Sequence, residues 1–273
     1  MAKESTSPPQ GTESVLDEVA EIAGYLWDRR WAERNAGGIS IDVTDQIKNT
    51  REVKTSSIGL DGLDVAGLAR RSILLTVPAS RMRDLARRPG NHAGIIRINE
   101  DSSGYRVVWG DPRRLSATAS VVMHLRIQNL LRVSHPELRV VLHTHPESLI
   151  AMTQMAEFKD EFRVNSVLWG MHPQSLHVVP NGVGLVRYLR AGTPELVDAT
   201  VRALTTNAVV LLEKHGCFAV GNNLSDTFDM IDTLEKSARI FFRVKSTGRT
   251  PEGLSDDQLQ DLRLAFLGGN EKQ

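Results

Sequence analysis

The chain has 273 residues, of which 41% are hydrophobic and 24% are charged, values that are ordinary for a globular protein. This composition excludes a wholly disordered chain and a collagen-like one. The 33 basic residues balance the 33 acidic ones, so no global field draws the chain to nucleic acid or to an anionic membrane.

Two further features concern the cell compartment and the domain organisation. Cys217 is the one cysteine of the sequence, which excludes an internal disulfide and favours a reducing compartment such as the cytoplasm. The longest apolar runs, such as 208–212, are far shorter than the roughly 18 residues of a membrane helix. Residues 1–13 are polar and contain two prolines, and they resemble no secretory signal, so we expect a disordered tail. Residues 14–273 are interpreted as one domain.

Helices and strands are predicted along the whole domain. A first helix follows Ser14, because Val15, Val19, Ile22 and Leu26 recur at steps of three and four residues. In chain order, we then expect strands at 40–43, 72–77, 93–98 and 105–109, a helix at 118–133, a strand at 139–145, helices at 148–158 and 162–169, one or two strands within 177–188, a helix from Thr193, strands at 209–212 and 217–220, a long helix from Ser225 and a last helix from Ser255.

Local signals indicate how some of these elements connect and begin. Residues 101–104 have turn chemistry, which predicts that the strands on either side pair as a hairpin. Thr193 is followed by Pro194, a favoured pair at a helix start. Because strands and helices alternate and a hairpin is expected, the sequence predicts an α/β domain with an antiparallel component.

The most informative of the eight histidines are His143 and His145. Residues two apart on a strand point to the same face, so both imidazoles can converge on one ion. His215 lies where another strand ends and is the candidate third ligand. Three neutral imidazoles and an open position fit catalytic zinc, although histidine pairs at this spacing also occur on protein surfaces. Cys217 is interpreted as a small core residue instead of a ligand.

Several motifs follow one another in an order that resembles the class II aldolases, and among these the rhamnulose-1-phosphate aldolases. The motifs are Trp31–Gly38, Arg81–Arg87, His143–Pro146, Leu149–Thr153, Glu213–Gly216 and the segment 228–238. The resemblance implies one α/β domain with a central, mainly antiparallel sheet flanked by helices, assembled as a homotetramer. Leu168, Trp169 and Met171 form an apolar segment that we expect at a subunit interface.

The resemblance also implies a chemistry. His143, His145 and His215 match the family's Zn²⁺ ligands, and Asn35 matches a substrate-binding asparagine. The implied reaction, in rhamnose metabolism, is retro-aldol cleavage of a ketose 1-phosphate to dihydroxyacetone phosphate and L-lactaldehyde. The expected partner is therefore a small sugar or sugar phosphate, with no nucleic acid and no membrane.

The sequence departs from the family where proton transfer and phosphate binding are expected. Ser120 stands at the position of the catalytic glutamate, and Gln174 at that of a glutamate from a neighbouring subunit. The phosphate-binding turn becomes 77–79, where Pro78 has no N–H to donate, and Gly38 replaces a second asparagine. A serine hydroxyl is no base near neutral pH without an activating partner. We therefore expect weak activity on the sugar phosphate. The alternative is a re-purposed zinc protein that acts on an unphosphorylated carbonyl compound or only binds.

Overall fold

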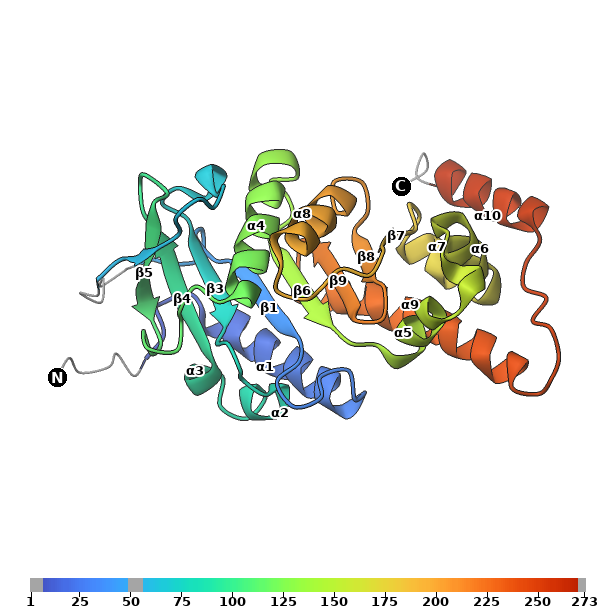
Figure 1. The fold of residues 1–273 in the computed structure, drawn as a ribbon, viewed down its shortest axis with the longest axis horizontal. Coiled ribbons are helices and arrows are strands. Elements are labelled where there is room, and N and C mark those ends of the chain that lie inside the picture. Colours follow the sequence, from blue (N-terminus) through green and yellow to red (C-terminus); the bar gives the residue numbers. More distant parts are fainter. Residues whose placement is uncertain (1–6, 49–55, 270–273) are drawn as a thin grey trace.

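Strands from all parts of the chain meet in one central sheet. The computed structural model describes residues 7–48 and 56–269, and within these the sheet has nine strands (Figure 1). The strands are β1 (Gly38–Asp42), β2 (Ile58–Gly59), β3 (Ser72–Thr76), β4 (Ala93–Ile98), β5 (Gly104–Trp109), β6 (Val140–Thr144), β7 (Val183–Val186), β8 (Val209–Leu212) and β9 (Gly216–Gly221). Their order across the sheet is β2-β5-β4-β3-β1-β6-β9-β8-β7.

Antiparallel pairing predominates in this sheet. Within the described residues, β7 and β8 form the one parallel pair, while the other neighbours run antiparallel. The pairing of β4 with β5 confirms the hairpin that the turn at 101–104 predicts. The α/β class and the mainly antiparallel sheet are therefore confirmed.

Helices cover both faces of the sheet. They are α1 (Glu13–Asp28), α2 (Met82–Leu85), α3 (Pro89–His92), α4 (Ala119–Ser134), α5 (Glu147–Gln154), α6 (Glu161–Met171), α7 (Gln174–Val178), α8 (Pro194–Ala203), α9 (Leu224–Lys245) and α10 (Asp256–Gly269), with short 3-10 turns at Ala66–Leu68 and Ala156–Phe158. One core joins α1, α5, α6 and α9 to one sheet face. On the opposite face α4 and α8 lie together, as Figure 1 shows.

Strand β6 illustrates how the sequence distributes its side chains between the two faces. Val140 and Leu142 belong to the core beneath α9, whereas Val141 belongs to the core beneath α4 and α8. Side chains alternate along a strand, so His143 lies on the same face as Val141. The histidine is thereby directed toward α4 and α8.

The starts of α4 and α8 follow the capping signals of the sequence. Thr118 Oγ1 accepts a hydrogen bond from the Val121 N–H, and Thr193 Oγ1 accepts one from the Leu196 N–H. Pro194 occupies the first turn of α8, as predicted. These two helix starts matter for function because both lie beside the histidines described below.

The expected disordered tail over residues 1–13 is wrong for its last part. Residues 1–6 lie outside the described residues, but Thr12 is fully buried and Glu13 already begins α1. Thr12 Oγ1 donates to the Pro9 carbonyl at 2.7 Å, and the Lys48 N–H donates to the Gln10 carbonyl at 3.1 Å. The polar composition of the segment concealed these contacts, because the backbone makes most of them.

The segment 177–188 contains the single strand β7, which confirms the expectation of one or two strands there, while its first two residues belong to helix α7. The apolar segment around Leu168 is partly covered by the chain itself. Leu168 is fully buried, Trp169 Nε1 donates to the Val179 carbonyl at 3.1 Å, and the Arg263 guanidinium lies 4.4 Å from the Trp169 ring. Trp169 and Met171 are half-buried, so the subunit interface expected at this segment stays a prediction.

Candidate functional site

Three histidines meet where β6 ends and β8 turns into β9. His143 is the fourth residue of β6, His145 follows the strand, and His215 lies in the turn between β8 and β9. Because β9 pairs with β6 so that Cys217 faces Thr144, the turn reaches the end of β6. One ligand atom from each histidine lies within 4.8 Å of the others. The structure therefore brings together the three residues proposed from the sequence.

Close backbone packing sets this geometry. A Cβ on Gly216 would lie 2.5 Å from the Thr144 carbonyl oxygen and 2.7 Å from Cδ2 of His145. Lys214 has a φ of 65°, a left-handed conformation, and its N–H donates to Thr153 Oγ1 at 2.8 Å. The glycine after His215 is thus required for β9 to approach β6 this closely.

The hydrogen bonds of the imidazoles determine which nitrogen each presents. His143 Nδ1 donates to the Cys217 carbonyl at 2.9 Å, since a carbonyl can only accept. His145 Nδ1 lies 2.9 Å from Glu33 Oε1. The Nε2 atom of His145 is buried and has no hydrogen-bond partner among the described residues. A buried polar atom without a partner is unfavourable, and a metal ion between the three rings would satisfy it.

Burial favours the neutral imidazole in two of the three histidines, His143 and His215. Burial lowers the pKa of His143 well below its ordinary value, and the nearby His145 and His215 lower it further. Burial and His145 likewise lower the pKa of His215. Burial is the largest single effect on the Glu33 pKa and raises it, but the hydrogen bond with His145, a backbone hydrogen bond and the nearby His145 and His215 together lower it. A metal binds the neutral form of imidazole, and a set of three histidine nitrogens fits Zn²⁺.

Glu213 anchors the turn that carries His215. Its carboxylate is buried, pairs with Lys159, and accepts hydrogen bonds from Arg187 Nε at 2.9 Å and the Tyr188 N–H at 3.0 Å. The hydrogen bond from Lys159 contributes most to lowering the Glu213 pKa to about 2. Glu213, which directly follows β8, is therefore held in place by Lys159 and by the segment 187–188.

A cavity of about 250 Å³ adjoins the three histidines. Its walls are Asn35, Ala36, Gly37, Ala119, Ser120, Met123, His143, His145, Ala191, Gly192, Leu196, Val197, Leu212, His215 and Phe218. Asn35 and Ser120 thus lie where the sequence analysis expects substrate-binding and catalytic groups. Gln174 is exposed on α7 and is not part of this wall, and neither is the turn at 77–79.

His124 is a buried histidine whose environment could not be read from the sequence. Its Nδ1 lies 2.9 Å from Ser40 Oγ, which also accepts from Gln128 Nε2 at 3.0 Å. Burial lowers the His124 pKa to about 4. A Cβ on Gly38 would lie only 2.7 Å from His124 Nε2, so the asparagine that the resemblance places at this position cannot enter unless His124 moves. The only signal in the sequence was that His124 lies four residues after Ser120 on the predicted helix, which places the two residues on the same helix face.

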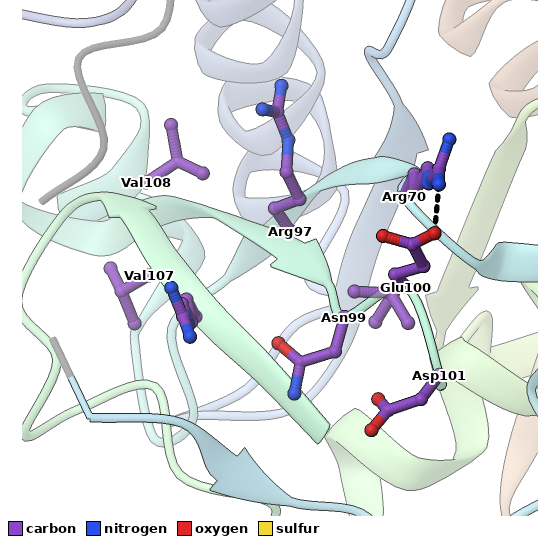
Figure 2. A pocket seen from close by; sticks show the side chains of 9 residues that line it. Arg70, Arg97, Asn99, Glu100, Asp101, Val107 and Val108 are labelled. Carbon is purple, nitrogen blue, oxygen red and sulfur yellow. Dashed lines mark hydrogen bonds and ion pairs between the residues drawn. The ribbon is translucent and has the colours of Figure 1, made fainter. Parts of the chain in front are cut away.

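A larger hollow of about 620 Å³ lies at the other end of the sheet, around β4 and β5. Figure 2 shows side chains of both charges around it, including the ion pair between Arg70 and Glu100. It shares no wall residue with the cavity beside the histidines. It therefore forms no part of the candidate site.

Comparisons with known proteins agree with this arrangement. Residues 17–242 match the family described as the Class II Aldolase and Adducin N-terminal domain. The chain is 34% identical over 255 residues to the rhamnulose-1-phosphate aldolase of Bacteroides thetaiotaomicron, covering 92% of this chain and 93% of that protein. It is 28% identical over 258 residues to that of Listeria welshimeri, covering 92% and 91%.

Solved structures show the same fold. A sugar-phosphate aldolase from Thermotoga maritima superposes with a TM-score of 0.72 at 26% identity, covering 88% of this chain and 98% of that one. A putative aldolase/epimerase/decarboxylase from Escherichia coli superposes with a TM-score of 0.65 at 20% identity, covering 92% and 98%, and is therefore similar in fold. With the family match extending from α1 into α9, this protein belongs to the class II aldolase and adducin family.

Proposed function

We propose that this protein is a zinc-dependent carbon–carbon lyase of the class II aldolase type, acting on a small ketose or a related hydroxycarbonyl compound. The observation that supports it most is the histidine cluster, with ligand atoms within 4.8 Å and a buried, unpartnered Nε2 on His145. Family membership and relatives named rhamnulose-1-phosphate aldolase favour a lyase. We also propose a tetramer in the cytoplasm, as the resemblance implies.

The residues around the cavity would bind the metal, bind the substrate and position a metal ligand. His143, His145 and His215 would hold Zn²⁺, which when bound supplies a Lewis acid that polarises a carbonyl oxygen. The Asn35 amide can donate a hydrogen bond to a substrate oxygen, and the Ser120 hydroxyl can donate or accept one. Glu33 would hold the His145 ring in place through its Nδ1–H.

The described part of the site lacks a carboxylate that could act as the general base for proton transfer. The described cavity wall contains no aspartate or glutamate, and the position of the family's base is Ser120. General acid–base catalysis typically contributes about 10²–10⁴-fold to a rate. We therefore propose that the protein cleaves rhamnulose 1-phosphate far more slowly than a family aldolase with its glutamate. Replacing Ser120 by Glu alone should recover little, because the phosphate turn is also changed.

The proposal is tested by metal analysis together with a cleavage assay. We expect one zinc per chain in the purified protein. His143→Ala should lower zinc affinity at least about tenfold, because a catalytic zinc site typically has about three protein ligands and the variant retains only two of them. His135→Ala is the matched control, since His135 bonds to the Thr205 carbonyl away from the cluster. Purified protein that binds no zinc, or an unchanged affinity in His143→Ala, would contradict the proposal.

The second candidate is a zinc-binding relative without aldolase activity. The serine at the catalytic position favours it, because a hydroxyl cannot replace a carboxylate base unaided. Product formation from rhamnulose 1-phosphate or from unphosphorylated ketoses separates the two candidates. Zinc-loaded protein that produces no aldehyde from either substrate class would support the second.

A further inference from the structure

The lining of the cavity beside the histidines contains two chemically distinct groups of residues. Asn35, Ser120 and the three histidines are polar. The second group is an apolar wall, which we define as Met123 of α4, Leu196 and Val197 of α8, Leu212 of β8 and Phe218 of β9. The wall begins at the cluster itself, because the His143 ring stacks on Phe218 with centroids 4.3 Å apart and planes 15° apart.

The residues of this wall are buried and belong to the hydrophobic core. Each of its five side chains is at most 8% exposed, and all five belong to the core between the sheet and helices α4 and α8. Apolar surface that faces a cavity gains free energy when a ligand covers it, roughly in proportion to the apolar area removed from water. A ligand group lying here is therefore favoured if it is apolar.

The described cavity lining offers no side chain that would pair with an anionic group of a ligand. The described cavity wall contains no lysine or arginine. The polar donors of the lining, such as the Asn35 amide and the Ser120 hydroxyl, carry no charge. Uncharged donors compensate less well than a lysine or an arginine for a phosphate dianion enclosed beside apolar side chains.

The size of the cavity limits the ligand further. Its volume of about 250 Å³ lies below the range of about 300–1,000 Å³ that is typical of sites for drug-sized molecules. The occupant is thus a small metabolite that reaches from the histidines to the apolar wall.

We propose that the site takes an unphosphorylated, small hydroxycarbonyl compound whose oxygen atoms face the histidines and whose apolar end packs on the wall of α4 and α8. This inference rests on the proposed zinc site and names the substrate class for it. Val197 is a specificity-determining residue in this arrangement.

Hydroxamates test the proposal by binding, independently of turnover. They chelate zinc and carry a variable tail. Titration calorimetry on the zinc-loaded protein compares acetohydroxamate with pentanohydroxamate, and glycolohydroxamate with phosphoglycolohydroxamate. One buried methylene is worth about fourfold in affinity, so pentanohydroxamate, with its longer alkyl tail, should bind at least about tenfold more tightly than acetohydroxamate. The phosphate should add less than about threefold, because its charge is poorly compensated.

Val197→Thr is the matched variant, since it retains the shape and adds a hydroxyl. It should reduce the preference for pentanohydroxamate over acetohydroxamate at least about threefold, because the added hydroxyl is a buried polar group without a partner. Val201→Thr on the same helix is the control and should leave the preference unchanged, because Val201 packs against the same core without lining the cavity.

The outcomes separate this inference from the proposed function. Tight binding of the phosphorylated hydroxamate with no gain from the longer alkyl chain overturns the inference and leaves the zinc site standing. Absence of zinc from the protein, as measured by elemental analysis before the titration, overturns the proposed function itself. An equal loss of the preference for pentanohydroxamate in both valine variants also overturns the inference.

Discussion

Glu33 accepts a hydrogen bond from Nδ1 of His145 and so fixes which nitrogen that ring presents to the cluster. Replacing it with Gln retains the size but removes the carboxylate, and changes of this kind typically cost about 10–100-fold in metal affinity. We expect Glu33→Gln to lower zinc affinity within that range, measured by competition with a chromogenic chelator. Glu137→Gln is a suitable control, because Glu137 also lies beside a histidine, His135, but away from the cluster. Equal zinc affinities in the two variants would rule out this role.

His124 makes stability depend on pH in a definite direction. Its folded-state pKa of about 4 is below the ordinary value of 6.5, because burial disfavours the charged ring. The unfolded state therefore binds a proton first as the pH falls, and stability is lost from about pH 6.5 down to about pH 4. At 1.36 kcal/mol per pKa unit, His124 should account for about 2 kcal/mol of the stability lost between pH 7.5 and pH 5.0.

Urea unfolding at the two pH values measures this contribution. His124→Gln cannot titrate, so its loss of stability over the same interval should be smaller by that amount. Taking the difference between the two proteins removes the contribution of the other histidines. An identical pH dependence in both proteins would show that the ring titrates normally.

At the scale of elements, helix α5 depends on a side chain from another helix for its first turn. The helix follows Pro146, which provides no capping side chain. Instead Glu235 of α9, which is buried, accepts from the Ser148 N–H and the Leu149 N–H, each at 2.9 Å. Because α5 follows His145 after one residue, this contact also holds the end of the candidate site in place.

Removing one of the two acceptor oxygens should destabilise the fold. Glu235→Gln leaves one buried N–H of α5 without an acceptor, and such a loss costs about 1–3 kcal/mol. We expect a decrease of about 2 kcal/mol in the free energy of unfolding, measured by chemical denaturation. The exposed Asp229 lies on the same helix, and Asp229→Asn should change stability by less than about 0.5 kcal/mol. Comparable losses in the two variants would contradict the capping role.

At the scale of the whole molecule, the proposed tetramer rests on the family resemblance. The segment around Leu168 stays a candidate for the interface, because Trp169 and Met171 are only half-buried by their own chain. We expect light scattering at micromolar concentration to give four times the mass of one chain. A monomer under these conditions would exclude a site shared between subunits.

No helix in the described part of the chain is both long and apolar enough to cross a membrane. The apolar run at 209–212 forms strand β8 of the sheet.

Local patterns in the sequence determined much of the fold, because they act over a few residues. The two-residue period of a strand was enough to place His143 and His145 together, and Thr193 with Pro194 was enough to start α8. Only the tertiary structure decided the rest. His215 joins the cluster because β9 pairs with β6, and the apolar wall exists because α4 and α8 pack on the same face. The packing of His124 against Gly38 joins residues far apart in the chain, and no local period encodes such a contact.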